Sequence, residues 1–343
     1  MTSRERVLAA FDHIAPDRVP TWCGASPEFL KNAQREIGVD EEGLRQRFGD
    51  DFRRVGAEYT GPDTIGIHRT FFGIDREGVG YGQPLVHPLA EASIADVHNH
   101  EWPDPDWMDV AGIKADAEKH NGEFAILGGD WSPFWHDAID LVGMENLYLK
   151  MYDEPEFVDA LMGHIVDYYF EVSRRTFEVA ADAMDIFFIG NDLGSQNGPL
   201  LGDHLFRRFV LPHLARLIDL GHSYGLKVML HCCGGFEPLI LSMIDAGLDG
   251  LHAIQPYCNG MDLRTLKEKY GDLILFNGCI DSQSVLIEGT PDLVREKTRE
   301  VIDIMKPGGG FVAGASHDYI LEETPLANVL AMFDEIREYG AYR

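Results

Sequence analysis

The chain has 343 residues, 45% of them hydrophobic and 25% charged, and 57 acidic against 29 basic residues give a formal net charge of −28. This composition excludes disordered and collagen-like proteins, and no apolar run approaches the roughly 20 residues of a membrane-spanning helix. A surface this negative repels phosphate groups, which argues against nucleic-acid and membrane partners. Five cysteines, two of them adjacent, are too few for a disulfide framework, so we expect a reducing, cytoplasmic location.

The first predicted element is a helical segment, residues 1–16, rather than a signal peptide, because Thr2 and Glu5 have the spacing of a capping box. After it, short runs rich in β-branched and aromatic residues alternate with helical stretches. Eight of these runs are predicted strands: residues 18–23, 51–55, 124–129, 185–190, 226–231, 250–255, 273–277 and 310–315. Some are apolar throughout, as at 186–189, which is typical of parallel strands buried on both faces.

Eight strands alternating with helices predict an α/β fold, a single (β/α)8 TIM-type barrel that spans residues 1–343. A doubly wound open sheet is the alternative, but the Gly-rich phosphate turn expected after its first strand is missing. The segment from about residue 58 to 121 is too long for an ordinary connection. We therefore interpret it as an insertion over the active-site face of the barrel.

In a barrel of this kind the site lies where the strands end, because the loops that follow the strands build it. Polar and thiol side chains gather at these ends in this sequence. They are Cys23, Asp130, Asp192, His231, Cys232, Cys233, Gln255, Cys279, Asp281, Ser316, His317 and Asp318. This convergence is the strongest functional signal in the sequence.

Four of these residues are candidate metal ligands. His231 and Cys233 are two apart on an extended segment, so both can face the barrel axis. Imidazole nitrogen and thiolate sulfur are zinc ligands, and the barrel brings Cys279 and His317 toward the same mouth. In the alternative interpretation, Cys233 is a small buried hydrophobic residue and His231 a hydrogen-bonded core residue.

Other residues at the strand ends are candidates for catalysis and substrate binding. Asp192 would hold a substrate hydroxyl or amine or act as a general base, with Gln196 beside it; an aspartate that caps a helix or closes a loop is the alternative. Trp131 and Trp135 would wall an aromatic pocket, with burial in a core as the alternative. The remaining candidates are Asp281 for catalysis, and Asp130 and Gln255 for substrate binding.

Three motifs make the chain resemble the uroporphyrinogen decarboxylase superfamily. They are His231-Cys232-Cys233-Gly234-Gly235, Asn277-Gly278-Cys279-Ile280-Asp281, and Gly308-Gly309-Gly310-Phe311 followed by Ser316-His317 and Thr324-Pro325. The resemblance implies a single (β/α)8 barrel and one of two chemistries. One is cofactor-free decarboxylation of uroporphyrinogen, and the other is zinc-dependent methyl transfer that involves cobalamin.

The residues after Pro20 favour the methyltransferase branch. Decarboxylases of the superfamily carry an Arg-rich segment there that binds the substrate carboxylates, whereas residues 21–28 of this chain contain no arginine. The branch's His-x-Cys zinc motif is matched by His231 and Cys233. Its third ligand, a cysteine after the last strand, is not matched: His317 stands near that position, and Cys279 is the other candidate.

The resemblance therefore implies Zn²⁺ and cobalamin as cofactors, with the cobalamin on a separate corrinoid protein. The implied function is the movement of a methyl group between cobalamin and a small-molecule donor or acceptor. Whether the protein forms a homodimer is left open. Two alternatives remain at this point: a cofactor-free decarboxylase of a small or tetrapyrrole acid, and a zinc-dependent binding protein without catalysis.

Overall fold

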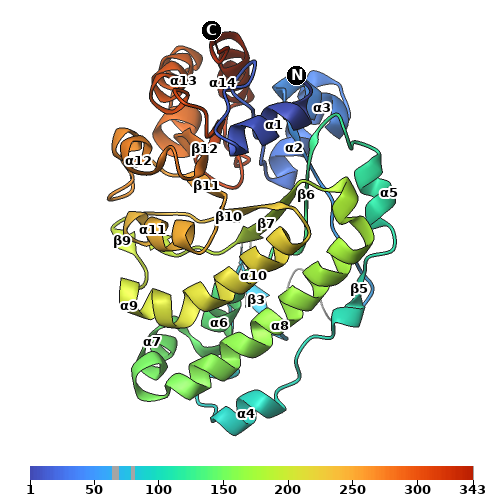
Figure 1. The fold of residues 1–343 in the computed structure, drawn as a ribbon, viewed down its shortest axis with the longest axis vertical. Coiled ribbons are helices and arrows are strands. Elements are labelled where there is room, and N and C mark those ends of the chain that lie inside the picture. The colour runs from blue at the N-terminus through green and yellow to red at the C-terminus, as the bar shows by residue number, and fades with distance from the viewer. Residues whose placement is uncertain (64–68, 79–81, 343) are drawn as a thin grey trace.

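The structure, a computed structural model, describes residues 1–63, 69–78 and 82–342. In this part of the chain seven parallel strands form one curled sheet (Figure 1). In chain order, which is also their order in the sheet, they are β1 (Phe52–Arg54), β6 (Ala125–Gly128), β7 (Ile186–Gly190), β10 (Lys227–His231), β11 (Gly250–Ile254), β12 (Leu275–Ile280) and β13 (Phe311–Ala315). The predicted α/β TIM-type fold is confirmed, with one regular strand fewer than expected.

The first predicted strand forms isolated bridges rather than a regular ladder. On one side the amide of Trp22 donates to the carbonyl of Ala313, and the amide of Ala313 donates to the carbonyl of Pro20, both at 2.9 Å. On the other side the amide of Asp51 donates to the carbonyl of Thr21 at 3.0 Å. Because Pro20 has no N–H to donate, a full ladder cannot form here. The segment nevertheless connects β13 to the start of β1 and so closes the barrel.

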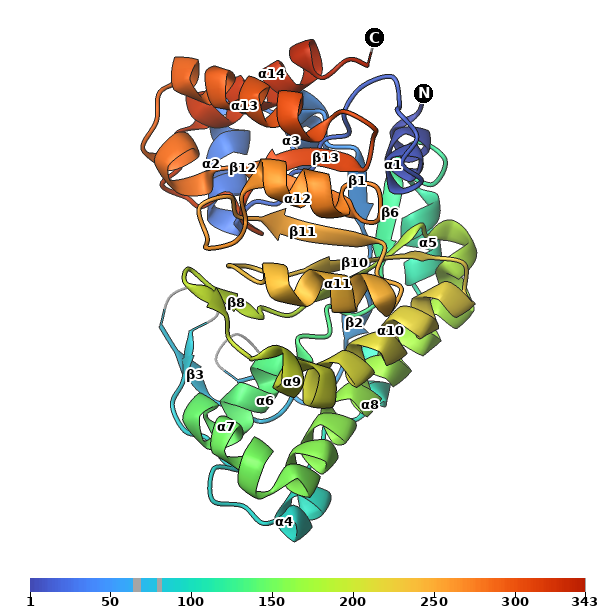
Figure 2. The same ribbon diagram turned by 60° about the vertical axis from the view of Figure 1, so that its left-hand side comes forward.

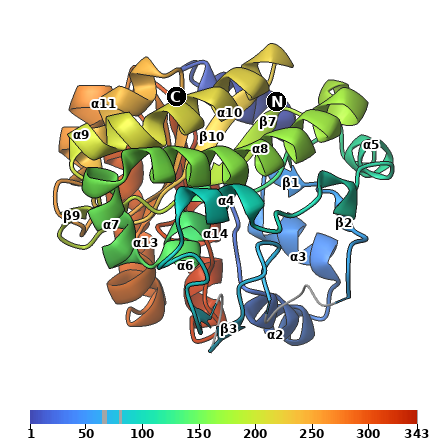
Figure 3. The same cartoon turned by 90° about the horizontal axis from the view of Figure 1, so that it is seen from below.

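Helices cover the outside of the sheet, and the long helix α8 lies beside α10 (Figure 3). The outer helices are α8 (Pro155–Ala180), α10 (Leu211–Ser223), α11 (Glu237–Asp245), α12 (Leu263–Tyr270), α13 (Pro291–Met305) and α14 (Leu326–Tyr339), with the short helical segments η2 (Ala181–Ala183), α9 (Asp203–Leu205), η3 (Phe206–Val210) and η4 (Ser282–Ile287) between them. Among the described residues, no helix combines the length and the apolar character that crossing a bilayer requires.

The N-terminal helices precede β1. They are α1 (Ser3–Phe11), α2 (Pro27–Ile37) and α3 (Glu41–Phe48). The predicted capping box is confirmed, since the Thr2 hydroxyl accepts from the amide of Glu5 at 3.1 Å and the Glu5 carboxylate accepts from the amide of Thr2 at 2.8 Å. Val7 and Phe11 of α1 pack into the barrel interior. This helix therefore plugs the amino-terminal end of the barrel.

The segment predicted as an insertion contains several small elements. They are β2 (Glu58–Tyr59), β3 (Arg76–Glu77), β4 (Gln83–Pro84), α4 (Ile94–Asn99), η1 (Pro105–Trp107), β5 (Met108–Asp109) and α5 (Ile113–Glu118). Figure 2 shows the arrows of β11 and β13 pointing toward the side on which β3 and β8 (Gly194–Ser195) lie. The carboxyl ends of the strands thus meet the insertion on one side of the molecule.

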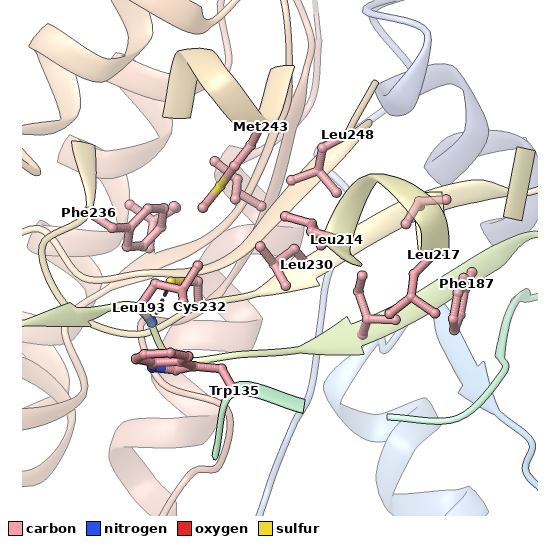
Figure 4. Close-up of a cluster of buried hydrophobic side chains, with 14 of the residues drawn as sticks. Trp135, Phe187, Leu193, Leu214, Leu217, Leu230, Cys232, Phe236, Met243 and Leu248 are labelled. Carbon is pink, nitrogen blue, oxygen red and sulfur yellow. Dashed lines mark hydrogen bonds between the residues drawn. The ribbon is translucent and has the colours of Figure 1, made fainter. Parts of the chain in front are cut away.

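Two apolar clusters form the core. The inner cluster fills the barrel and includes Ile186 and Phe188 of β7. The outer cluster lies between strands and helices, where Phe187 of β7 and Leu217 of α10 are fully buried (Figure 4). Successive residues of β7 therefore face opposite sides, and both sides are dry, which explains the continuous apolar run. Burial of each such side chain contributes roughly 1.5–3 kcal/mol.

Candidate metal centre and active site

The site is centred on the last residue of β10 and the residue two positions beyond it. His231 is only 4% exposed, and its Nε2 lies 3.3 Å from the sulfur of Cys233. Oδ1 of Asp192 accepts from the amide of Cys233 at 2.9 Å and lies 3.3 Å from His231 Nε2. The ligand atoms of all three residues lie within 4.8 Å of one another. An ion with bonds of roughly 2.0–2.3 Å can span such separations.

Two glycines allow the loop after β10 to approach β8 closely. Gly234 has a φ of +86°, and a Cβ there would lie 2.4 Å from the carbonyl carbon of Gly194. The amide of Gly235 donates to the carbonyl of Ser195 at 2.7 Å. Any larger residue at 234 would separate the two loops. This close packing brings Asp192, just before β8, to the thiol of Cys233.

Asp192 and His231 each stabilise the charged form of the other. Oδ2 of Asp192 lies 3.3 Å from Nε2 of His136. Burial raises the pKa of Asp192, but the hydrogen bonds and charges of His136 and His231 outweigh burial and hold this pKa far below its usual value. Burial also opposes protonation of His231, but Cys233 and Asp192 raise its pKa well above the ordinary value. Burial raises the pKa of the Cys233 thiol, and His231 partly offsets this. The thiolate thus depends on nearby positive charge.

A second set of ligand atoms overlaps the first. His231, His252 and Asp318 also place one ligand atom each within 4.8 Å of the others. His252 belongs to β11 and is fully buried, and burial lowers its pKa well below the ordinary value. Asp318 follows β13. In the described part of the chain, His317 belongs to neither set, and its Nδ1 lies 3.2 Å from the amide of Tyr319.

A cavity of about 840 Å³ opens above these residues. His231, Cys233 and Asp192 form part of its wall. The insertion and the strand ends supply most of the other described lining residues, which include Tyr59, Phe71, Arg76, Asp130, Trp131, His136, Asp137, Tyr169, His317 and Asp318. Its size and mixed aromatic and polar lining are typical of a small-molecule site.

The match to a family model extends from residue 70 to residue 339, and that model is described as uroporphyrinogen decarboxylase (URO-D). The match covers most of the chain. The chain belongs to this family. The predicted family membership is therefore confirmed.

Relatives in the URO-D family carry two kinds of name. Methylcobamide:CoM methyltransferase MtbA of Methanosarcina acetivorans is 23% identical over 234 residues, 67% of this chain and 63% of that protein, so the match covers less than two thirds of MtbA. A uroporphyrinogen decarboxylase of Mycolicibacterium gilvum is 29% identical over 279 residues, 75% of this chain and 74% of that protein. A solved methyltransferase structure from Methanosarcina mazei has a TM-score of 0.70 at 20% identity, with 99% of this chain and 100% of that chain covered, which shows a shared fold.

Cys279 does not join His231 and Cys233, which corrects the expectation that it is a candidate ligand. Its side chain is fully buried in the outer apolar cluster, and burial raises the pKa of its thiol. Gly278 and Cys279 have φ values of +106° and +74°, so the alternation of inward and outward side chains ends before Cys279. A thiol that burial keeps protonated in an apolar core is a poor metal ligand.

Four other candidates lie outside the described lining of the cavity. Trp135 is fully buried in the outer cluster (Figure 4), because α6 (Phe134–Val142) begins just before it and carries the indole into the core. Asp281 caps η4 and accepts from the amides of Gln283 and Val285. The other two are Gln196, exposed between β8 and β9 (Gly198–Pro199), and Gln255, whose Oε1 accepts from the amide of Gly234 at 2.7 Å.

Sequence reasoning missed His252 as a member of the site. The signal was present, because an imidazole in the otherwise apolar run at 250–254 needs a reason to be buried. Its pairing with His231 depends on the parallel register of β10 and β11, in which the two residues lie opposite each other. Sequence alone does not give that register.

Proposed function

We propose that this protein is a zinc-dependent methyltransferase that moves a methyl group between a small substrate or thiol and cobalamin held by a corrinoid protein. The observation that carries the proposal is the convergence of imidazole, thiol and carboxylate at His231, Cys233 and Asp192 in the wall of the cavity. The MtbA relatives support the same activity by their names.

The charge of the cavity argues against a tetrapyrrole carboxylate as the substrate. The described lining carries five aspartates and two arginines, namely Asp130, Asp137, Asp140, Asp192, Asp318, Arg69 and Arg76. Arg69 pairs with Asp75 at 2.8 Å, and Arg76 pairs with Asp140. Both arginines are thus already paired with an aspartate, so the described lining offers a substrate with several carboxylates no further arginine to bind. This favours methyl transfer over uroporphyrinogen decarboxylation, although some relatives have the latter name.

The donor set fits zinc. Nitrogen, sulfur and carboxylate oxygen are its usual protein ligands, and catalytic zinc keeps a position for substrate. His231 and Cys233 would hold the ion with Asp192, and Asp318 offers a further oxygen beside His231. When bound, the metal supplies a Lewis acid that lowers the pKa of a coordinated thiol or activates a leaving oxygen.

Neighbouring residues of the chain would manage the proton and exclude water. Burial raises the pKa of Asp137 to about 6, against the hydrogen bond that the Tyr169 hydroxyl donates to it at 2.5 Å. A carboxyl group with that pKa can accept the proton that a thiol loses on methylation. His136 would hold Asp192 in place through their 3.3 Å contact, and Trp131 would shield the reacting atoms from water.

The proposal is tested by following the absorbance spectrum of free cobalamin. Zinc-loaded protein is mixed with methylcob(III)alamin and a panel of small thiols, and with cob(I)alamin and methylated aromatic, amine and thiol compounds. We expect loss or gain of the methyl–cobalt spectrum with at least one partner, and none after zinc is removed by a chelator.

The same samples distinguish the decarboxylase alternative. Release of carbon dioxide from carboxylic acids without cobalamin, together with spectra that stay unchanged across the whole panel, would overturn the methyltransferase proposal. A sample that binds its ligands tightly without turnover of either kind would point to a binding protein.

A further inference from the structure

His252 lies directly beside the proposed metal ligand His231. The two residues are register partners on β10 and β11, and their Nδ1 atoms are 3.0 Å apart. The His252 side chain has no exposed surface. In the described part of the chain its Nε2 is a buried nitrogen without a hydrogen-bond partner. A fully buried imidazole with a single hydrogen bond calls for a functional explanation.

The short contact fixes where the protons are when a metal is bound. Two ring nitrogens 3.0 Å apart share one proton, since one must donate and the other accept. The Nε2 of His231 faces Cys233 and Asp192, so this is the nitrogen that would bind the ion. The proton of a neutral His231 is then on Nδ1 and is donated to Nδ1 of His252. His252 consequently carries its own proton on Nε2.

The surroundings of His252 hold its ring in this position. Trp22 packs against it at a centroid distance of 4.7 Å, and Phe188 lies at 5.3 Å in a T-shaped arrangement. Aromatic faces are weak acceptors, so they can accommodate an N–H that has no conventional partner.

We propose that His252 is a positioning residue that sets the tautomer and the ring orientation of His231 by accepting its Nδ1 proton. The inference rests on the proposed metal centre. Partners of this kind raise the basicity of a ligating histidine and are typically worth 10–100-fold in metal affinity. The oxygen of an asparagine occupies about the place of the histidine Nδ1, so His252→Asn retains the acceptor, whereas His252→Leu removes it.

The first measurement is zinc affinity, by competition with a chromophoric chelator. We expect His252→Leu to weaken zinc binding by 10–100-fold and His252→Asn to recover most of that loss. Asn277→Leu is the matched control, because Asn277 is the fully buried register partner of His252 on β12 and its Nδ2 contacts the sulfur of Met229 at 3.7 Å rather than His231. Its zinc affinity should stay within about twofold of wild type.

The second measurement needs no variant. In zinc-loaded wild-type protein labelled with ¹⁵N-histidine, we expect ring-nitrogen shifts of an Nδ1–H tautomer for His231 and an Nε2–H tautomer for His252. An Nδ1–H tautomer of His252, or zinc bound directly to it together with Asp318, would overturn the inference. So would a His252→Leu protein with wild-type zinc affinity. Wild-type protein that binds no zinc would instead overturn the metal centre itself. The wild-type spectrum still decides if the leucine variant does not fold.

Discussion

The barrel has a buried polar cluster at each end, and the two are built differently. At the amino-terminal end, Asp51 is fully buried and accepts from Arg6 at 2.8 Å, from Arg18 at 2.8 and 2.9 Å, from the hydroxyl of Ser3 at 2.6 Å and from the amide of Thr21 at 2.7 Å. Each oxygen of this carboxylate has a partner. We call the carboxylate and its partners the base cluster.

At the carboxyl-terminal end the polar groups are less completely paired. His231 lies 3.3 Å from both Cys233 and Asp192, and in the part of the chain that the structure describes the Nε2 of His252 has no hydrogen-bond partner. We call these four residues the mouth cluster. Buried polar groups normally have hydrogen-bond partners. In a barrel of this kind the amino-terminal end of the strands serves stability, whereas the carboxyl-terminal end carries the site. The difference supports the proposal that the mouth cluster binds a ligand, whereas the base cluster stabilises the fold.

The base cluster gives the largest expected effect on stability. Asp51→Ala removes the buried counter-charge of Arg18, leaves Arg6 with the more exposed Asp17, and removes the acceptor that ties Thr21 to the start of β1. Loss of one partner of a buried ion pair costs roughly 3–5 kcal/mol, so we expect that fall in the free energy of unfolding by urea. Asp116→Ala, in the exposed pair with Lys119, is the control and should change little. If Asp51→Ala lowers the free energy of unfolding no more than Asp116→Ala does, the base cluster does not stabilise the fold and the contrast with the mouth cluster is wrong.

The mouth cluster is tested by its two contrasting cysteines. Cys233→Ser should weaken zinc binding more than about 100-fold, because a hydroxyl is a poor zinc ligand and stays protonated. Cys279→Ala should leave zinc affinity unchanged within about twofold, because its thiol lies in the apolar core. Isothermal titration of metal-free protein measures both. Equal losses in the two variants would mean that the loop after β12 moves to the metal.

Asp137 gives a smaller, pH-dependent effect. The pKa of Asp137 is about 6 in the folded protein and 3.8 in the unfolded chain. Between these pH values the folded protein binds a proton that the unfolded chain has lost, so the free energy of unfolding falls as the pH rises from about 4 to 6. At about 1.4 kcal/mol for each tenfold change in proton affinity, we expect a loss of roughly 2 kcal/mol. Asp137→Asn, which still accepts from Tyr169, should remove that loss, so that the variant is the more stable protein at pH 7.5 but not at pH 4. Urea unfolding at both pH values measures it. An unchanged difference between the two proteins would show that Asp137 is not desolvated.

The limits of sequence reasoning are clearest at the two loops that follow β10 and β12. His231 and Cys233 were predicted to face the same side, and they do, because side chains alternate along the extended segment that carries them. Cys279 was misplaced because Gly278 and Cys279 turn to positive φ, and no residue-level pattern reports that change. Trp135 was misplaced because a helix begins just before it. In each case a local backbone turn, rather than residue type, decided which way the side chain points.

The sequence by itself determined the parallel α/β architecture and the His-x-Cys pair, because hydrophobic periodicity and residue chemistry are local properties of the chain. Its motifs carried the resemblance to the family. The tertiary structure decided what completes the site. Strand register placed His252 against His231, and the packing of the loop after β10 on β8 brought Asp192 to Cys233. These two contacts join residues 21 and 41 positions apart, so they depend on how strands align and loops pack. Strand alignment and loop packing are set by the burial of the whole chain rather than by any one segment.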